Sequence, residues 1–166
     1  MIGLKAQPFP LGEKRASTVT GLAGLLGEYF PCQTGLGEGV CRLVQLDNAS
    51  GVTSVGGEAV SFTTVAAEDF DVDLTTAGDA CAGVFHQDQV DLDDNDYVLV
   101  IVEGDVKLSV GAAISAAGHY VDTGNSGVAA DGNTTFSQAA NIGKALETSA
   151  GADTDLKVRL RGRLLG

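Results

Sequence analysis

Glycine interrupts this chain so often that a long helix is disfavoured throughout. The sequence has 23 glycines in 166 residues, about twice the usual share of ~7%. Each glycine inside a helix would cost about 1 kcal/mol relative to alanine. The runs between the glycines are rich in Val, Leu and Thr, which favour strands. The composition therefore predicts an all-β chain of short strands joined by tight turns.

Several of these runs alternate between apolar and polar residues, as a half-buried strand requires. Phe70, Val72 and Leu74 alternate with three aspartates, which predicts one buried and one wet, acidic face. Further strands are expected at residues 39–46, 59–65, 80–85, 112–124 and 156–164. Roughly seven to nine strands at about ten-residue spacing predict a small β-barrel or a sandwich-like domain.

The clearest pair of strands lies in the second half of the chain. Residues 97–102, YVLVIV, are apolar throughout, which predicts a strand that is buried on both faces. Gly104 follows, and then residues 106–110, VKLSV, continue as a second strand. We expect these two strands to form a β-hairpin around Gly104.

The first residues differ in composition from the rest. We expect residues 1–35 to form an N-terminal arm and docking segment, and residues 36–166 to form the β domain. Residues 1–16 contain Pro8 and Pro10 and show no periodicity. We therefore expect this arm to be extended, disordered in the free protein and ordered on a neighbouring chain.

Two segments are ambiguous. Residues 17–30 fit either a short helix that forms on docking or an irregular apolar segment, and Pro31 ends both. Residues 136–149 are rich in alanine and fit a helix, but Gly143 at their centre counts against it.

The charges are divided between an acidic body and two basic ends. The net charge is −12, and residues 16–156 hold all but one of the acidic residues. An acidic body repels a nucleic-acid backbone, so no direct nucleic-acid partner is expected. The apolar runs are too short to span a bilayer, so no membrane partner is expected either.

No catalytic motif is present, and the chain is not expected to be an enzyme. The sequence contains no nucleophile-elbow, zinc-protease or phosphate-loop motif, and neither of its two histidines lies in one. No cofactor is expected.

Asp91, Asp93 and Asn95 match the first ligands of a calcium loop, but Asp96 stands where that loop needs glycine. Residues 91–96 therefore fit a solvated acidic turn or a weak cation site. The three cysteines, Cys32, Cys41 and Cys81, are expected to serve as small, buried apolar side chains.

A stripe of positive charge ends the chain. Lys157, Arg159, Arg161 and Arg163 recur at every second residue, which places them on one face of a strand. They fit either a charged edge that blocks unwanted pairing or an electrostatic contact with another chain. Acceptors for that contact would be Asp69, Asp71 and Asp73 of a second copy, or an acidic patch on a partner. The candidate interface residues at the two ends are Ile2, Leu4, Phe9, Leu11, Lys14, Arg15, Lys157, Arg159, Arg161 and Arg163.

A series of glycine-led apolar steps runs through residues 78–162. A valine-rich strand leads through a glycine turn into a second valine-rich strand, and two small-residue steps precede the final strand. The positions are Val98–Val102, Gly104, Val106–Val110, Ala117–Gly118–Val121, Gly143–Ala145–Leu146 and Val158–Leu160. This order resembles the small head-decoration, or capsid cement, proteins of tailed bacteriophages.

The resemblance implies a structural protein without catalytic residues. It implies a β-rich homotrimer that is made in the host cytoplasm and binds the outer surface of the capsid. There it would bridge neighbouring major capsid proteins. The alternative is a carbohydrate- or receptor-binding β module of a virion fibre or secreted adhesin. Sugar-binding platforms usually expose Trp or Tyr, and this chain has no Trp and three Tyr.

Overall fold

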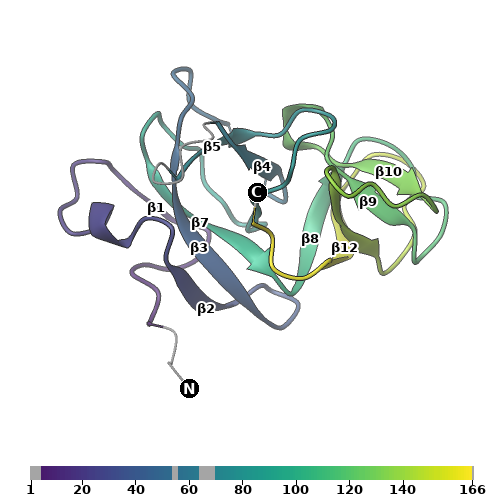
Figure 1. Cartoon of the computed structure of the whole chain (residues 1–166), viewed down its shortest axis with the longest axis horizontal. Coiled ribbons are helices and arrows are strands. Elements are labelled where there is room, and N and C mark those ends of the chain that lie inside the picture. The colour runs from purple at the N-terminus through teal and green to yellow at the C-terminus, as the bar shows by residue number, and fades with distance from the viewer. Residues whose placement is uncertain (1–4, 54–55, 64–69, 166) are drawn as a thin grey trace.

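The computed structural model describes residues 5–53, 56–63 and 70–165. Within them, regular structure consists of twelve strands and two single 3-10 turns, Ala23–Leu25 and Asn125–Gly127 (Figure 1). The strands form one sheet of seven and one of five. The prediction of an all-β, barrel- or sandwich-like fold is therefore confirmed.

Five strands of the larger sheet close into a ring. Neighbours pair in the order β7–β6–β4–β5–β3, and β3 pairs back with β7 along most of its length. The β3–β5 pair is parallel, whereas the other pairs in the ring are antiparallel. The ring strands are β3 (Glu38–Leu46), β4 (Ala59–Phe62), β5 (Asp71–Leu74), β6 (Gly83–Phe85) and β7 (Tyr97–Glu103). Two further strands extend this barrel: β1 (Lys14–Arg15) pairs with β7, and β2 (Tyr29–Gln33) pairs with β3.

The smaller sheet is antiparallel throughout and lies beside the barrel in Figure 1. Its strand order is β10–β9–β11–β12–β8. The strands are β8 (Asp105–Val110), β9 (Tyr120–Asp122), β10 (Ala130–Asn133), β11 (Asn141–Ala145) and β12 (Asp153–Leu160). Because β12 has a partner on both sides, it is an interior strand of this sheet.

The chain passes from the barrel to the smaller sheet at Gly104. The predicted hairpin is wrong, because β8 pairs with β12 and lies in the other sheet from β7. Gly104 has φ +119°, and a Cβ there would lie 3.1 Å from the Glu38 carbonyl oxygen. A left-handed backbone and close neighbours both favour glycine at this corner. At this corner the chain therefore leaves the larger sheet and enters the smaller one, and it does not fold back as a hairpin.

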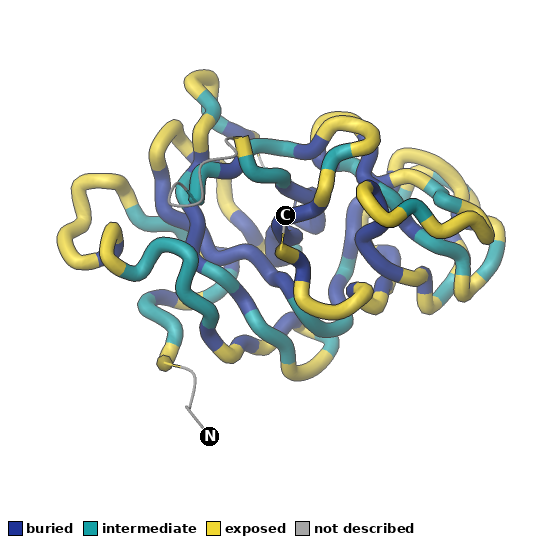
Figure 2. Tube along the Cα trace, in the orientation of Figure 1, coloured by how far each residue is buried: buried dark blue, intermediate teal, exposed yellow. Residues whose placement is uncertain are grey.

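One apolar cluster fills the barrel and continues under the smaller sheet. It contains Phe85 of β6, Ile101 of β7, Leu108 of β8 and Leu156 of β12, all 1% exposed or less. The run Val98–Val102 is buried along its whole length, as its apolar sequence predicted. Figure 2 shows this buried chain in the middle of the molecule and the exposed turns at its periphery.

Neither of the two ambiguous segments forms an α-helix in the described part of the chain. The segment 17–30 contains one 3-10 turn and then enters β2 at Tyr29. Pro31 does not end the segment but lies within β2, where it is tolerated because β2 is an edge strand. The alanine-rich segment 136–149 contains β11, with Gly143 in the middle of that strand.

Residues 5–15 are packed against the barrel, which differs from the disordered arm that the sequence predicted. Phe9 is 4% exposed and joins a second apolar cluster with Phe30, Leu43 and Leu99. The backbone of Lys14 and Arg15 pairs with β7 as strand β1. An aromatic anchor inside a core cluster explains why a segment without periodicity can still be ordered.

Candidate interaction surface

The C-terminal stripe crosses the exposed face of the smaller sheet. Lys157 and Arg159 of β12 are exposed and alternate with buried Leu156 and Val158, as the periodicity predicted. Because β12 is paired with β11 and β8, the interpretation as a charged edge strand is wrong. Arg161 and Arg163 follow the end of the strand, so the four cations are not all on one strand face.

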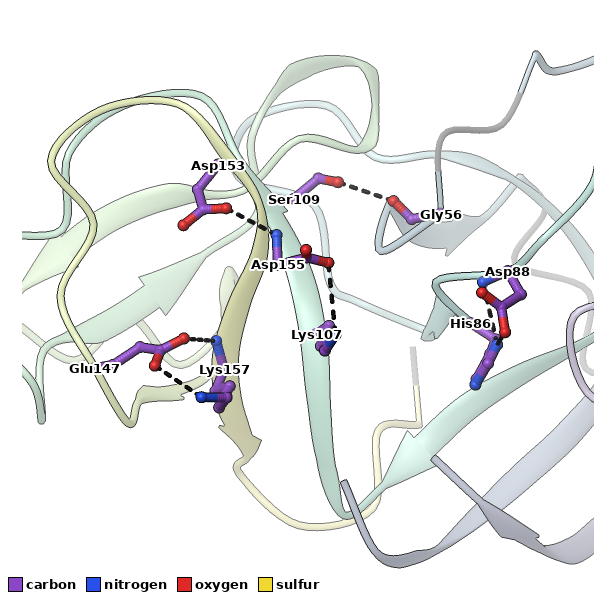
Figure 3. Close-up of polar contacts among 9 residues, drawn as sticks. All are labelled: Gly56, His86, Asp88, Lys107, Ser109, Glu147, Asp153, Asp155 and Lys157. Carbon is purple, nitrogen blue, oxygen red and sulfur yellow. Dashed lines mark hydrogen bonds and ion pairs between the residues drawn. The ribbon is translucent and has the colours of Figure 1, made fainter. Parts of the chain in front are cut away.

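Three of the four stripe cations are paired within the same chain. Lys157 Nζ lies 3.1 Å from Glu147 (Figure 3), and Arg163 Nε lies 3.1 Å from Glu103. Arg159 holds Asp105 of β8 with two parallel hydrogen bonds, 2.8 and 2.9 Å long. Exposed pairs of this kind contribute little to stability, because water screens the two charges. Their effect is to reduce the net positive charge that the stripe can offer to another chain.

The acidic acceptors named from the sequence lie elsewhere. Asp71 and Asp73 belong to β5 of the barrel, and Asp69 lies outside the described residues. Asp73 accepts a hydrogen bond from the Asn48 side chain at 2.9 Å.

The N-terminal candidates are divided between the core and the surface. Ile2 and Leu4 lie outside the described residues. Leu11 is partly buried against both apolar clusters. Lys14 forms ion pairs of 2.9 Å with Asp93 and 3.0 Å with Asp96, and the Arg15 guanidinium lies 4.9 Å from the centre of the Phe9 ring. Lys14 thereby ties the N-terminal segment to the acidic loop between β6 and β7.

The Arg159–Asp105 pair makes part of the stability dependent on pH. Hydrogen bonding to Arg159 lowers the pKa of Asp105 below its ordinary value of 3.8. A carboxyl whose pKa is lower in the folded state stabilises the fold above the unfolded pKa of about 3.9, and this stability is lost as pH falls through the folded value. We therefore expect Asp105→Asn to reduce the loss of stability between about pH 6 and pH 2.

Urea unfolding at the two pH values measures this difference for wild type and variant. Asp91→Asn is the matched control, because Asp91 is exposed and forms no ion pair with a described residue. It should keep the wild-type difference in stability between the two pH values. An Asp105→Asn protein that loses as much stability in acid as wild type would contradict the assignment.

On the same face, Arg159 has neighbours that were not singled out from the sequence as interface residues. Tyr120 of β9, Lys144 of β11 and Arg159 of β12 are cross-strand neighbours. The Lys144 ammonium lies 4.9 Å from the centre of the Tyr120 ring, and Phe136 packs edge-on against that ring at 5.4 Å. Phe136 lies in the connection between β10 and β11, where no periodicity marks its neighbours.

The cysteines are buried, and neither histidine ring bonds a hydroxyl or thiol that it could activate as a nucleophile among the described residues. Cys32, Cys41 and Cys81 are all buried and free. Burial raises the pKa of the Cys81 thiol to about 12, so this thiol stays protonated and unreactive at neutral pH. His119 contacts Asp131 at 3.2 Å and His86 contacts Asp88 at 3.7 Å. Neither ring bonds a hydroxyl or thiol of a described residue.

The described residues also give no sign of a metal or membrane site. In these ranges, no three His, Cys, Asp or Glu side chains come together in a way that would bind a metal ion. The loop at Asp91–Asp96 is instead occupied by the Lys14 ion pairs and by internal hydrogen bonds such as Asp93 N–H to Asp96, 2.8 Å. None of the helical segments described has the length and apolarity needed to cross a membrane.

Comparison with known proteins finds a likeness of fold. No family model and no curated protein sequence matches the chain. Among solved structures, the fold is similar to that of the N base of head fiber gp8.5 in bacteriophage phi29, with a TM-score of 0.53 and 16% sequence identity. The aligned part covers 76% of this chain and 98% of that one. The likeness to the base of this phage head fiber is therefore one of fold.

Proposed function

We propose that this protein is a structural component of a tailed-phage virion that binds the outer surface of the head. The observation that carries the proposal is the similarity in fold to nearly the whole N base of the phi29 head fiber. The glycine-led steps in residues 78–162 support the same class of protein. In its finer form, the proposal is that copies of this chain form a homotrimer and bridge neighbouring major capsid proteins as a cement.

The contacts that the three tyrosine rings make within the chain favour this function over sugar recognition. A sugar platform needs an open aromatic face, whereas Tyr97 is buried and the Tyr29 ring lies beside both Arg42 and Arg163, at 4.9 and 4.8 Å. Tyr120 is contacted by Phe136 and Lys144. All three tyrosine rings thus have partners within the chain.

Heads that lack the chain provide the test. Particles should be purified from the source phage after deletion of the coding sequence and then mixed with the purified protein. We expect saturable binding to these heads and added density on their outer surface in cryo-electron microscopy. Fully decorated heads serve as the control and should take up no further protein. Absence of binding to the deleted heads, together with reproducible binding on a glycan array, would overturn the proposal in favour of the sugar-binding alternative.

A further inference from the structure

An open groove of about 820 Å³ lies on the exposed side of the smaller sheet. Its walls come from β9, β11 and β12 and from the turns at their ends. They include Tyr120, Phe136, Lys144, Leu146, Arg159 and Arg161. Phe136 is 51% exposed and Leu146 is 40% exposed. Large apolar side chains that gather in one hollow, with charged groups around them, mark a contact site more often than scattered ones do.

The groove is a positive site in an acidic molecule. The chain has 22 acidic residues against 10 basic ones, yet Lys144 and Arg161 form no ion pair with a described carboxylate. Arg161 instead donates to the Gln138 carbonyl at 2.9 Å, and Lys144 lies over the Tyr120 ring. Two unpaired cations beside exposed apolar side chains fit an occupant that carries carboxylates around an apolar group.

The same chain displays such an element in the loop between β6 and β7. Val90 is 48% exposed, and in the sequence it lies between Asp88 and Asp91, which are also exposed. The loop is held in place by paired hydrogen bonds of 2.8 Å between Val52 and Leu92, and by one of 2.9 Å from the Gln89 N–H to the His86 carbonyl. An apolar side chain on an ordered loop binds with little loss of conformational entropy.

The loop and the groove lie on opposite sides of the molecule. The loop contacts β1 through the Lys14–Asp93 ion pair, and Figure 1 shows β1 and the groove strands β9 and β12 on opposite sides of the barrel. We propose that the acidic loop around Val90 docks into the groove of a second copy of this chain. Such a contact is head-to-tail and closes into a ring when the rotation between copies allows it. The inference rests on the self-association part of the proposed function.

Single substitutions on the two sides test the contact. Sedimentation velocity over a concentration series measures association of the full-length protein at low and high salt. We expect association to weaken with salt, and Lys144→Glu or Val90→Ser to weaken it at least about tenfold. Val19→Ser and Lys5→Glu are matched controls, because Val19 is also an exposed valine and Lys5 carries the same charge elsewhere. Both should associate as wild type does.

A mixture of the two variants distinguishes the proposed head-to-tail contact from a symmetric contact between two copies. The Lys144→Glu chain keeps an intact loop and the Val90→Ser chain keeps an intact groove, so a head-to-tail contact predicts a two-chain complex in the mixture. Formation of that complex also shows that both variants are folded. A mixture that stays monomeric, or single variants that associate like wild type, would overturn the inference.

Head binding distinguishes this inference from the proposed function. Wild type that associates in solution but does not bind deleted heads would refute the function and leave the contact standing. Wild type that stays monomeric at every concentration, while Lys144→Glu loses head binding, would overturn the self-contact. That result would assign the groove to the capsid protein.

Discussion

Replacing Arg42 by alanine is expected to lower the free energy of unfolding by roughly 3 kcal/mol. The Arg42 guanidinium lies 4.9, 5.3 and 4.6 Å from the ring centres of Tyr29, Phe62 and Phe70. Its Nε–H also donates to the Gly27 carbonyl at 3.0 Å. Truncation removes three cation–π contacts and leaves a carbonyl without its charged donor. The melting temperature should fall by roughly 6–12 °C.

Urea unfolding measures the effect, and two further variants separate its causes. Arg42→Lys keeps the charge but loses the planar guanidinium, so it should recover part of the loss. Lys144→Ala is the matched control, because Lys144 also lies over a tyrosine ring but is exposed. It should cost less than about 1 kcal/mol. An Arg42→Ala protein as stable as this control would refute the role given to the three rings.

Phe9→Ala is expected to destabilise the free protein by about 3 kcal/mol. Phe9 lies in the second apolar cluster beside Phe30 and Leu99, and the Arg15 guanidinium covers its ring. Loss of the ring leaves a cavity where the N-terminal segment meets the barrel. The expectation is opposite to that for a disordered arm, whose side chains would contribute nothing to the stability of the free protein.

Phe136→Ala is the matched control for this experiment. Phe136 is the exposed phenylalanine of the groove, so its truncation should cost less than about 1 kcal/mol. Thermal unfolding of the two variants beside wild type provides the comparison. Equal melting temperatures for Phe9→Ala and wild type would contradict this expectation and favour the prediction of a disordered arm.

The strands that alternate most clearly were predictable from the sequence, because a period of two decides which side chains are buried whatever the partners are. This holds for Leu156, Val158 and Leu160 in β12. Pairing was less predictable, since β7 and β8 show the pattern of a hairpin whether they fold back or turn a corner at Gly104. That choice depends on β12, which lies about fifty residues further along the chain.

The candidate surface was also predictable only in part, because the partners of its side chains are distant in sequence. Alternation showed that Lys157 and Arg159 face outward, but their partners Glu147 and Asp105 come from other strands. The groove was missed because its aromatic members lie on separate elements and carry no shared spacing. Phe9 was misplaced because its burial depends on Phe30 and Leu99, neither of which is near it in sequence.

Closure of the barrel has a consequence for how the chain is made. Gln45 in β3 pairs with Tyr97 in β7, and Val40 pairs with Glu103. During synthesis at about 5–20 residues per second, the edge of β3 that pairs with β7 therefore stays without its partner for several seconds. Pairing between such distant segments is slow, typically milliseconds to seconds in β proteins. Nascent chains that stop short of Glu103 should consequently be the species that chaperones bind and that aggregate.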